Sequence, residues 1–265
     1  MSSETQALLS HENRHGFEGE IKPGPDAKHP YYRRLMGCPC PAIATMINHS
    51  YLNPQDDKEK LPFMAFVQAL RDCYNFSLPF AFLFVFLANL RLGTLRQGGF
   101  SLEALKNHGV LEHDASITRY DEQDGDHLGP QPELIDEFLK SSNHLTNLEE
   151  GPKMVTLHDY AEKRVQLERK ITSYLPTQPK YRVRLLGVGE AALALLAFRE
   201  KNSALTGNEV CAREEWLRVW YHEERLPVEL GWKNRRSGHK MGIVGFGRIC
   251  HQIHKRMKMI ESAVW

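Results

Sequence analysis

Apolar residues recur at helical spacing along most of this chain, and few segments alternate between apolar and polar residues as strands do. Residues 61–72 follow this pattern and predict an amphipathic helix. Residues 185–198 are rich in Ala and Leu, which favour helix. Four further helices are expected at residues 133–148, 154–174, 214–221 and 242–259.

The most apolar segment, residues 76–90, contains five phenylalanines and is interrupted by Pro79. It is too short to cross a membrane as a helix. Phe76, Phe80 and Phe84 are four residues apart, so on a helix they share one face. The segment is therefore either a buried core helix or a helix that lines an apolar ligand channel.

Long polar connections separate the predicted helices, and no internal repeat is present. Residues 120–131 are expected to form such a loop, and Ser101 is a plausible N-cap for a helix that follows it. Residues 1–30 are polar and rich in Gly, Pro and His, which predicts an extended lead-in. We therefore expect an all-α fold: a single compact multi-helix domain with long connecting loops at residues 31–265.

Composition narrows the function. The 265 residues include 34 Lys and Arg against 33 Asp and Glu, for a net charge of +1, which argues against a nucleic-acid partner. Five cysteines are too few and too scattered for a disulfide framework, and no second pair stands at zinc spacing. The first residues lack a basic and apolar leader, so we expect an intracellular protein, or a secreted one whose signal has been removed. Neither a membrane partner nor a particular oligomeric state is indicated.

The segment Gly37-Cys38-Pro39-Cys40-Pro41 precedes an apolar run and offers the first candidate chemistry. Pro41 suits the first position of a helix, which places Cys40 at or beside the N-cap. Free backbone N–H groups and the positive end of the helix dipole favour a thiolate there. A thiolate held in this way suits a haem iron or another soft metal, although a packed free thiol is the simpler interpretation.

Two further segments contain candidate acid–base residues. Glu112-His113-Asp114 is either a capped turn or part of a catalytic set. Glu190 lies within the apolar segment 185–198, where a carboxyl group needs solvent, a partner or a shifted pKa. A carboxyl group beside a histidine is a plausible acid–base pair.

Together the three segments resemble the fungal haem-thiolate peroxidases, the chloroperoxidase and unspecific peroxygenase superfamily, from about Tyr31 to about Trp232. The resemblance includes Pro39-Cys40-Pro41 with residues 48–52, residues 100–109 leading into residues 112–116, and residues 224–227 with Gly231-Trp232. The order and spacing of these motifs are more specific than any one of them.

The resemblance implies a role for each matching residue. Cys40 would be the axial ligand of the iron in haem b. Glu190 would be the distal acid–base residue, oriented by His113, which Asp114 would hold in turn. Glu112, the backbone carbonyl of His113 and Ser116 would bind Mg²⁺ or Mn²⁺. Other members carry an Arg about two turns before the glutamate, where this chain has Val183.

The activity implied is an H2O2-dependent peroxygenase or peroxidase that oxidises small apolar or aromatic substrates through a ferryl haem. The phenylalanines of residues 76–90 favour oxygenation over halogenation, with Phe76, Phe80 and Phe84 as candidate channel residues. Haloperoxidase activity is one alternative. Two others are a non-enzymatic haem-binding regulator and a family member that isomerises or dehydrates its substrate without peroxide. Cys38 has no assigned role.

Overall fold

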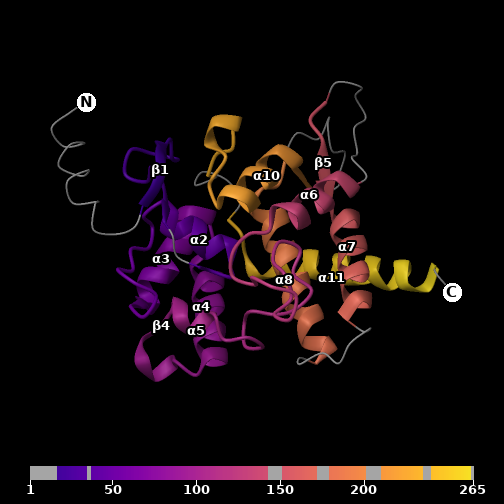
Figure 1. Cartoon of the computed structure of the whole chain (residues 1–265), viewed down its shortest axis with the longest axis horizontal. Helices are drawn as coiled ribbons and strands as arrows, with labels where there is room; N and C mark the ends of the chain where they lie inside the picture. The colour runs from indigo at the N-terminus through magenta and orange to yellow at the C-terminus, as the bar shows by residue number, and fades with distance from the viewer. Residues whose placement is uncertain are drawn as a thin grey trace.

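Helices make up most of the described chain, which confirms the predicted all-α class (Figure 1). The computed structural model describes residues 17–34, 37–142, 151–171, 179–200, 210–234 and 240–263. The helices are α2 (Pro41–Asn48), α3 (Phe63–Tyr74), α4 (Leu78–Leu92), α5 (Leu102–Leu105), α6 (Pro132–Ser141), α7 (Leu157–Lys170), α8 (Lys180–Ala197), α10 (Glu214–Glu223) and α11 (Ile243–Ala263), with short 3-10 turns η1 (Leu95–Gln97) and η3 (Val228–Leu230).

Three antiparallel pairs of short strands connect these helices. They are β1 (Phe17–Lys22) with β2 (Tyr31–Arg34), β3 (Lys60–Pro62) with β4 (Gly99–Ser101), and β5 (Met154–Thr156) with β6 (Cys211–Arg213). The sequence pattern predicted none of them. Five of the six have only three or four residues, too few to show an alternating pattern, whereas β1 has six alternating residues and lies in a segment predicted as an extended lead-in. Each strand forms because its partner is brought beside it by the tertiary fold.

Several predicted boundaries shift for local reasons. The helix expected at 154–174 starts at Leu157, because Thr156 and Asp159 form a capping box after β5. Pro79 does not interrupt α4 but lies in its first turn, where a proline is tolerated. The described part of the expected lead-in contains β1, and residues 1–16 lie outside the described residues. So do residues 143–148 and 172–174 of two predicted helices.

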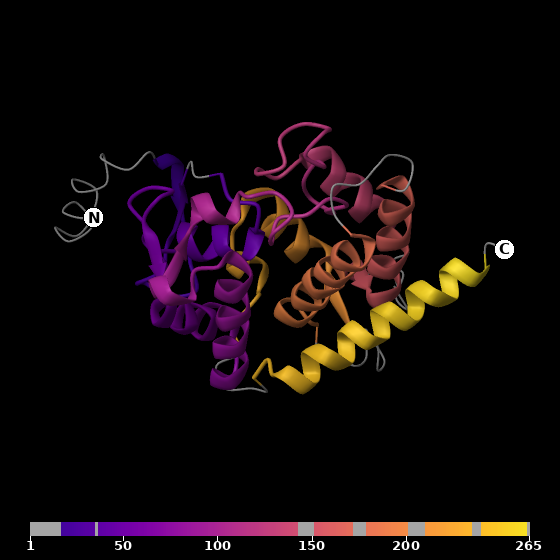
Figure 2. The same ribbon diagram turned by 90° about the horizontal axis from the view of Figure 1, so that it is seen from below.

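The helices form two groups that α11 joins (Figures 1 and 2). The first group, α2 to α5, lies on the N-terminal side, and the second contains α6, α7, α8 and α10. The long α11 runs beneath the second group and packs against α7 and α8. Met241, two residues before α11, forms a parallel β-bridge with Phe76. Its backbone carbonyl also accepts a hydrogen bond from Ser77 N at 2.8 Å. One continuous apolar core extends through both groups.

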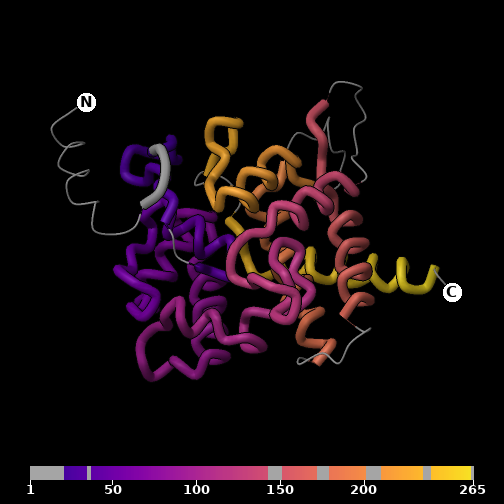
Figure 3. The backbone as a smooth tube through the Cα atoms, in the orientation of Figure 1, coloured from indigo at the N-terminus to yellow at the C-terminus, as the bar shows by residue number. Residues whose placement is uncertain are grey.

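The tube in Figure 3 shows that the loop at 120–131, predicted from its polarity, has no regular secondary structure. Among the described helices, none is long and apolar enough to cross a membrane.

His49 fixes the end of α2 through both of its ring nitrogens. The side chain is fully buried, and its Nδ1–H donates to His29 O at 3.0 Å. Leu226 N–H donates to the other nitrogen, Nε2, also at 3.0 Å. Because Nε2 must accept, the folded state requires a neutral imidazole. Burial accordingly lowers the pKa of His49 to about 4.

We expect stability to fall as the pH is lowered from about 6.5 to about 4, because the unfolded chain then binds a proton that folded His49 excludes. The full contribution of this residue is about 3 kcal/mol. His49→Gln keeps one donor and one acceptor but has no charge to gain. Urea unfolding followed by circular dichroism at pH 4 to 7 should show a shallower pH dependence for the variant. Parallel curves would contradict this role.

Candidate functional site

Cys40 occupies the N-cap of α2, as the two prolines around it predicted. Its backbone is extended (φ −103°, ψ 112°), Pro41 follows in the first turn, and Cys40 O accepts from Ala44 N at 3.0 Å. The neighbouring Cys38 is buried, and its thiol donates to Cys40 O at 3.4 Å. The sulfur of Cys40 is thus held on a rigid turn at the start of a buried helix.

Burial raises the pKa of the Cys40 thiol to about 11. The backbone N–H groups of Ile43 and Ala42 oppose this shift, as expected at a helix N-terminus. The negative charge of Glu190 raises the pKa as well, which means that this carboxylate lies within electrostatic range of the sulfur. The helix terminus alone therefore does not ionise the thiol; a bound cation that replaces the proton would.

Glu190 projects from α8 and lies 3.3 Å from Nε2 of His113, measured to its Oε2. The Nδ1–H of His113 donates to the backbone carbonyl of Asp114 at 2.7 Å. With Nδ1 donating, Nε2 attracts the carboxylate only if it also holds a proton, so we assign an imidazolium–carboxylate pair. The pKa directions agree. Burial alone would lower the pKa of His113, but the negative charge of Glu190 raises it overall. Burial alone would raise the pKa of Glu190, but the positive charge of His113 lowers it overall.

The two members of this pair differ in their surroundings. The side chain of His113 is 2 % exposed, whereas that of Glu190 is 52 % exposed. The protein around Glu190 nevertheless disfavours its charge by desolvation. A carboxylate that is both surrounded by protein and open on one side can exchange a proton with a small molecule that reaches it.

Asp114 contacts the imidazole of His113 through its backbone carbonyl and not through its carboxylate. The carboxylate lies 3.7 Å from Nε2 of His108 and accepts from Glu122 N at 3.4 Å. The chain reverses at Ala115, whose φ of +60° is left-handed, and this turn directs the Asp114 side chain away from His113.

The expected magnesium or manganese ligands are only partly free for that purpose. The carboxylate of Glu112 is buried and accepts from Nδ1 of His108 at 2.5 Å. Ser116 Oγ accepts from Thr118 N at 3.3 Å. In the described parts of the chain, no three His, Cys, Asp or Glu side chains are grouped as a metal site. A cation here would share the Glu112 carboxylate with His108, and no contact of the described residues supports this ion.

The sequence did not point to Arg164, a fully buried arginine of α7 that joins the two halves of the site. Its guanidinium donates to the carbonyl of Ala115 and, at 3.3 Å, to that of Val183, which begins the second turn of α8. It also pairs with Glu168 at 3.0 Å. Arg164 thus connects the His113 loop to the helix that presents Glu190.

Gly187 makes room for Arg164. A Cβ atom at this position would lie 2.1 Å from Cζ of the guanidinium, which is too close for any side chain. The glycine one turn before Glu190 was the available sequence signal that another side chain packs against this helix. Glycine also occurs in helices for other reasons, so the signal was not specific. Arg164 itself lies in a charged segment where the sequence pattern predicts solvent exposure.

Phe76 and Phe80 belong to the packed core and are each 4 % exposed. Their rings stack at 4.7 Å, Phe84 packs edge-on at 6.0 Å from Phe76, and Phe246 of α11 lies 5.2 Å from Phe80. The core interpretation therefore holds for Phe76 and Phe80. A Cβ at Gly189 would lie 3.7 Å from Phe246, so this aromatic group ends one residue from Glu190.

The structure thus brings a thiol at the N-cap position of a helix into electrostatic range of a carboxylate–imidazolium pair. A comparison with protein families identifies the class of protein: the model described as peroxidase, family 2, matches residues 28–237. The chain belongs to this family of chloroperoxidase-type haem-thiolate peroxidases, whose members use H2O2 and a haem-type cofactor. Cys40, His113 and Glu190 all lie within the matched region. No curated protein matches the chain.

We predict that Gly187→Ala destabilises the protein by about 1–3 kcal/mol, because the added methyl group overpacks the site of the buried guanidinium. Gly189→Ala, two residues along the same helix, is the matched control, since its methyl group meets only an ordinary contact. It should be neutral or stabilising by about 0.5–1 kcal/mol from helix propensity. Thermal and urea unfolding of both variants measure the difference, and equal stabilities would refute the proposed packing.

Proposed function

We propose that this peroxidase is a haem-thiolate peroxygenase/peroxidase in which Cys40 ligates haem b and Glu190 is the distal acid–base residue. The observation that supports it best is the 3.3 Å pair of Glu190 with the buried His113, in a chain that also holds Cys40 at the N-cap of α2. The charge of Glu190 raises the pKa of the Cys40 thiol, which agrees with this assignment. A soft sulfur donor and a carboxylate suit haem iron and its peroxide substrate.

The residues present fit a haem group. The thiol is half-buried, on a rigid turn, and retains its proton at neutral pH, so iron replacing that proton would neutralise the site. On α8, Leu185 is 70 % exposed and provides apolar surface on the helix that presents Glu190. When bound through Cys40, the haem group would supply the redox chemistry that removes electrons from a substrate or transfers oxygen to it.

The proton transfers fall to Glu190. Its lowered pKa keeps the carboxylate ionised, so it can take the first proton of hydrogen peroxide. The same carboxyl group then returns the proton to the oxygen that leaves as water. His113 keeps the carboxylate in position through the 3.3 Å pair, and its own proton stays on Nε2 because Asp114 O occupies Nδ1–H.

Two buried arginines support this charge arrangement. Arg164 fixes the His113 loop against α8, and its positive charge lowers the pKa of Glu190. Arg119 lowers the pKa of both Glu190 and Cys40 while donating to Cys38 O at 3.3 Å. Both cations favour the ionised forms that acid–base work and iron ligation need.

We favour apolar and aromatic organic molecules as substrates over halide ions. Phe246 reaches within 3.7 Å of the Cβ position of Gly189, the residue before Glu190, and an apolar wall orients a C–H or C=C bond better than it holds a hydrated anion.

We predict that Cys40→Ala abolishes the long-wavelength absorption band that thiolate ligation gives the ferrous–CO form of the haem protein. Cys38→Ala is the matched control: it also removes a thiol from this turn, but this thiol points to Cys40 O. Absorption spectra of both purified variants with CO decide the case. Retention of the band in Cys40→Ala would show that another residue ligates the iron.

We predict that Glu190→Gln lowers peroxide-driven turnover by about 10²–10⁴-fold while haem binding is retained, because the amide accepts no proton. Glu103→Gln, an exposed glutamate of α5, controls for loss of a surface charge. Steady-state rates with H2O2 and a small aromatic substrate measure the effect, and bound haem is quantified by absorbance. Unchanged turnover in Glu190→Gln would favour a non-enzymatic haem-binding role or a different acid.

A further inference from the structure

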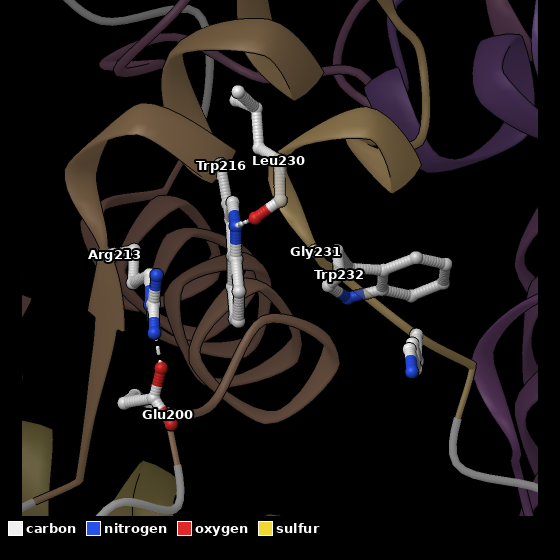
Figure 4. Close-up of a pocket in the computed structure, with 7 residues that line it drawn as sticks. Glu200, Arg213, Trp216, Leu230, Gly231 and Trp232 are labelled. Atoms are coloured by element: carbon white, nitrogen blue, oxygen red, sulfur yellow. Dashed lines mark hydrogen bonds and ion pairs between the residues drawn. The ribbon is translucent and has the colours of Figure 1, made fainter.

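A pocket of about 240 Å³ opens beside two tryptophans that the proposed mechanism does not use (Figure 4). Its lining consists of Glu200, Arg213, Trp216, Leu230, Gly231, Trp232 and Lys233. Figure 4 shows the indole rings of Trp216 and Trp232 apart from each other, with the joined Arg213 and Glu200 on the side of Trp216 that faces away from Trp232. Its volume is below the ~300–1,000 Å³ typical of sites for drug-sized ligands, so it suits a molecule with a single ring.

The polar groups of this pocket hold its aromatic rings in place. Trp216 Nε1–H donates to Leu230 O at 3.0 Å, and Trp232 Nε1–H donates to Ala197 O at 3.1 Å. The Arg213 guanidinium lies 4.8 Å over the Trp216 ring and pairs with Glu200 at 2.6 Å. Arg213 covers one face of Trp216, so an aromatic ligand with a hydroxyl group would contact the exposed parts of the two indoles and direct its hydroxyl to the charged side chains of the lining.

A continuous series of aromatic rings leads from this pocket into the protein. The ring centroid of Trp232 lies 5.8 Å from that of Phe198, and Phe198 lies 4.9 Å from Trp220. All three side chains are at most 5 % exposed. Trp220 Nε1–H then donates to the hydroxyl of Tyr74 at 3.3 Å.

The inner end of this series reaches α2 next to Cys40. The Tyr74 hydroxyl donates to Ala42 O at 3.2 Å, two residues from the cysteine. The tilted ring of Tyr221 lies 4.8 Å from that of Trp220. The series therefore connects the pocket to the helix turn that carries Cys40.

Indole is among the protein side chains most easily oxidised by one electron, and its radical cation need not lose a proton at once. Tyr74 differs, since its proton faces only a carbonyl, which is a poor base. Trp220 and Trp232 are thus the residues suited to be oxidised transiently to radical cations. Phe198 lies between them and shortens the gap without being oxidised itself.

We propose that the pocket between Trp216 and Trp232 is a second substrate site, where phenols lose single electrons through Trp232 and Trp220. This inference rests on the proposed function, because the oxidant is H2O2 acting at the haem site. The overall reaction is H2O2 + 2 ArOH → 2 H2O + 2 ArO•. Each phenol releases one electron to Trp232 and one proton to solvent, and two electrons with two protons reduce peroxide to water at the interior site.

The test uses the haem-loaded protein with 2,6-dimethoxyphenol as the one-electron donor and a small apolar substrate for oxygenation. Trp232→Phe should lower kcat for the phenol by about tenfold or more and leave oxygenation unchanged. Trp216→Phe is the matched control, because it lines the same pocket but is outside the ring series. It should change KM for the phenol and not kcat.

A second readout does not depend on turnover. Haem-loaded protein treated with H2O2 in the absence of any donor should gain oxygen at Trp232 and Trp220, as peptide mass spectrometry detects. Trp220→Phe should prevent the modification of Trp232 by cutting the route. A protein that reacts with peroxide spectroscopically, yet shows neither modified tryptophans nor a kcat effect in Trp232→Phe, would overturn this inference alone. Failure to bind haem would instead overturn the proposed function.

Discussion

The geometry of the candidate site depends on one buried cation, the guanidinium of Arg164. Removing such a group from water is costly unless its hydrogen bonds are satisfied inside the protein. Here the terminal nitrogens have two backbone carbonyls and Glu168 as partners, while the buried Nε has none, and the carbonyls belong to the His113 loop and to α8. The requirement to satisfy one charge therefore fixes two segments relative to each other, and the 3.3 Å His113–Glu190 distance follows from their positions.

Local sequence signals predicted the parts of the fold that local chemistry determines. Cys40 caps α2 because Pro41 starts the helix, and Ser101 caps α5 by accepting from Ala104 N at 3.2 Å. The strand β5 escaped prediction since three residues have no period to read. It exists only because the fold brings residues 211–213 beside it. The two strands are separated in the sequence by α7 and α8.

The sequence likewise predicted those features of the site that local motifs determine. The motif around residues 112–116 identified His113 and Glu190 as partners, and the structure brings them together. It did not indicate that Asp114 contacts His113 through its backbone carbonyl, because no residue type that favours a left-handed turn marks the one at Ala115. Arg164 lies on a third element, and the only sequence trace of its position is the absence of a side chain at Gly187.

The charge on the two facing groups explains why this arrangement suits a metal centre. Glu190 is ionised beside His113, and its charge disfavours a second anion at Cys40, whose thiol pKa burial and Glu190 raise to about 11. Arg119 only partly offsets this effect. The sulfur therefore exchanges its proton for another cation at little electrostatic cost, whereas a free thiolate would face the carboxylate unscreened. Burial, with the charge of Glu190 adding to it, thus keeps Cys40 protonated, and the same surroundings favour iron once it replaces the proton.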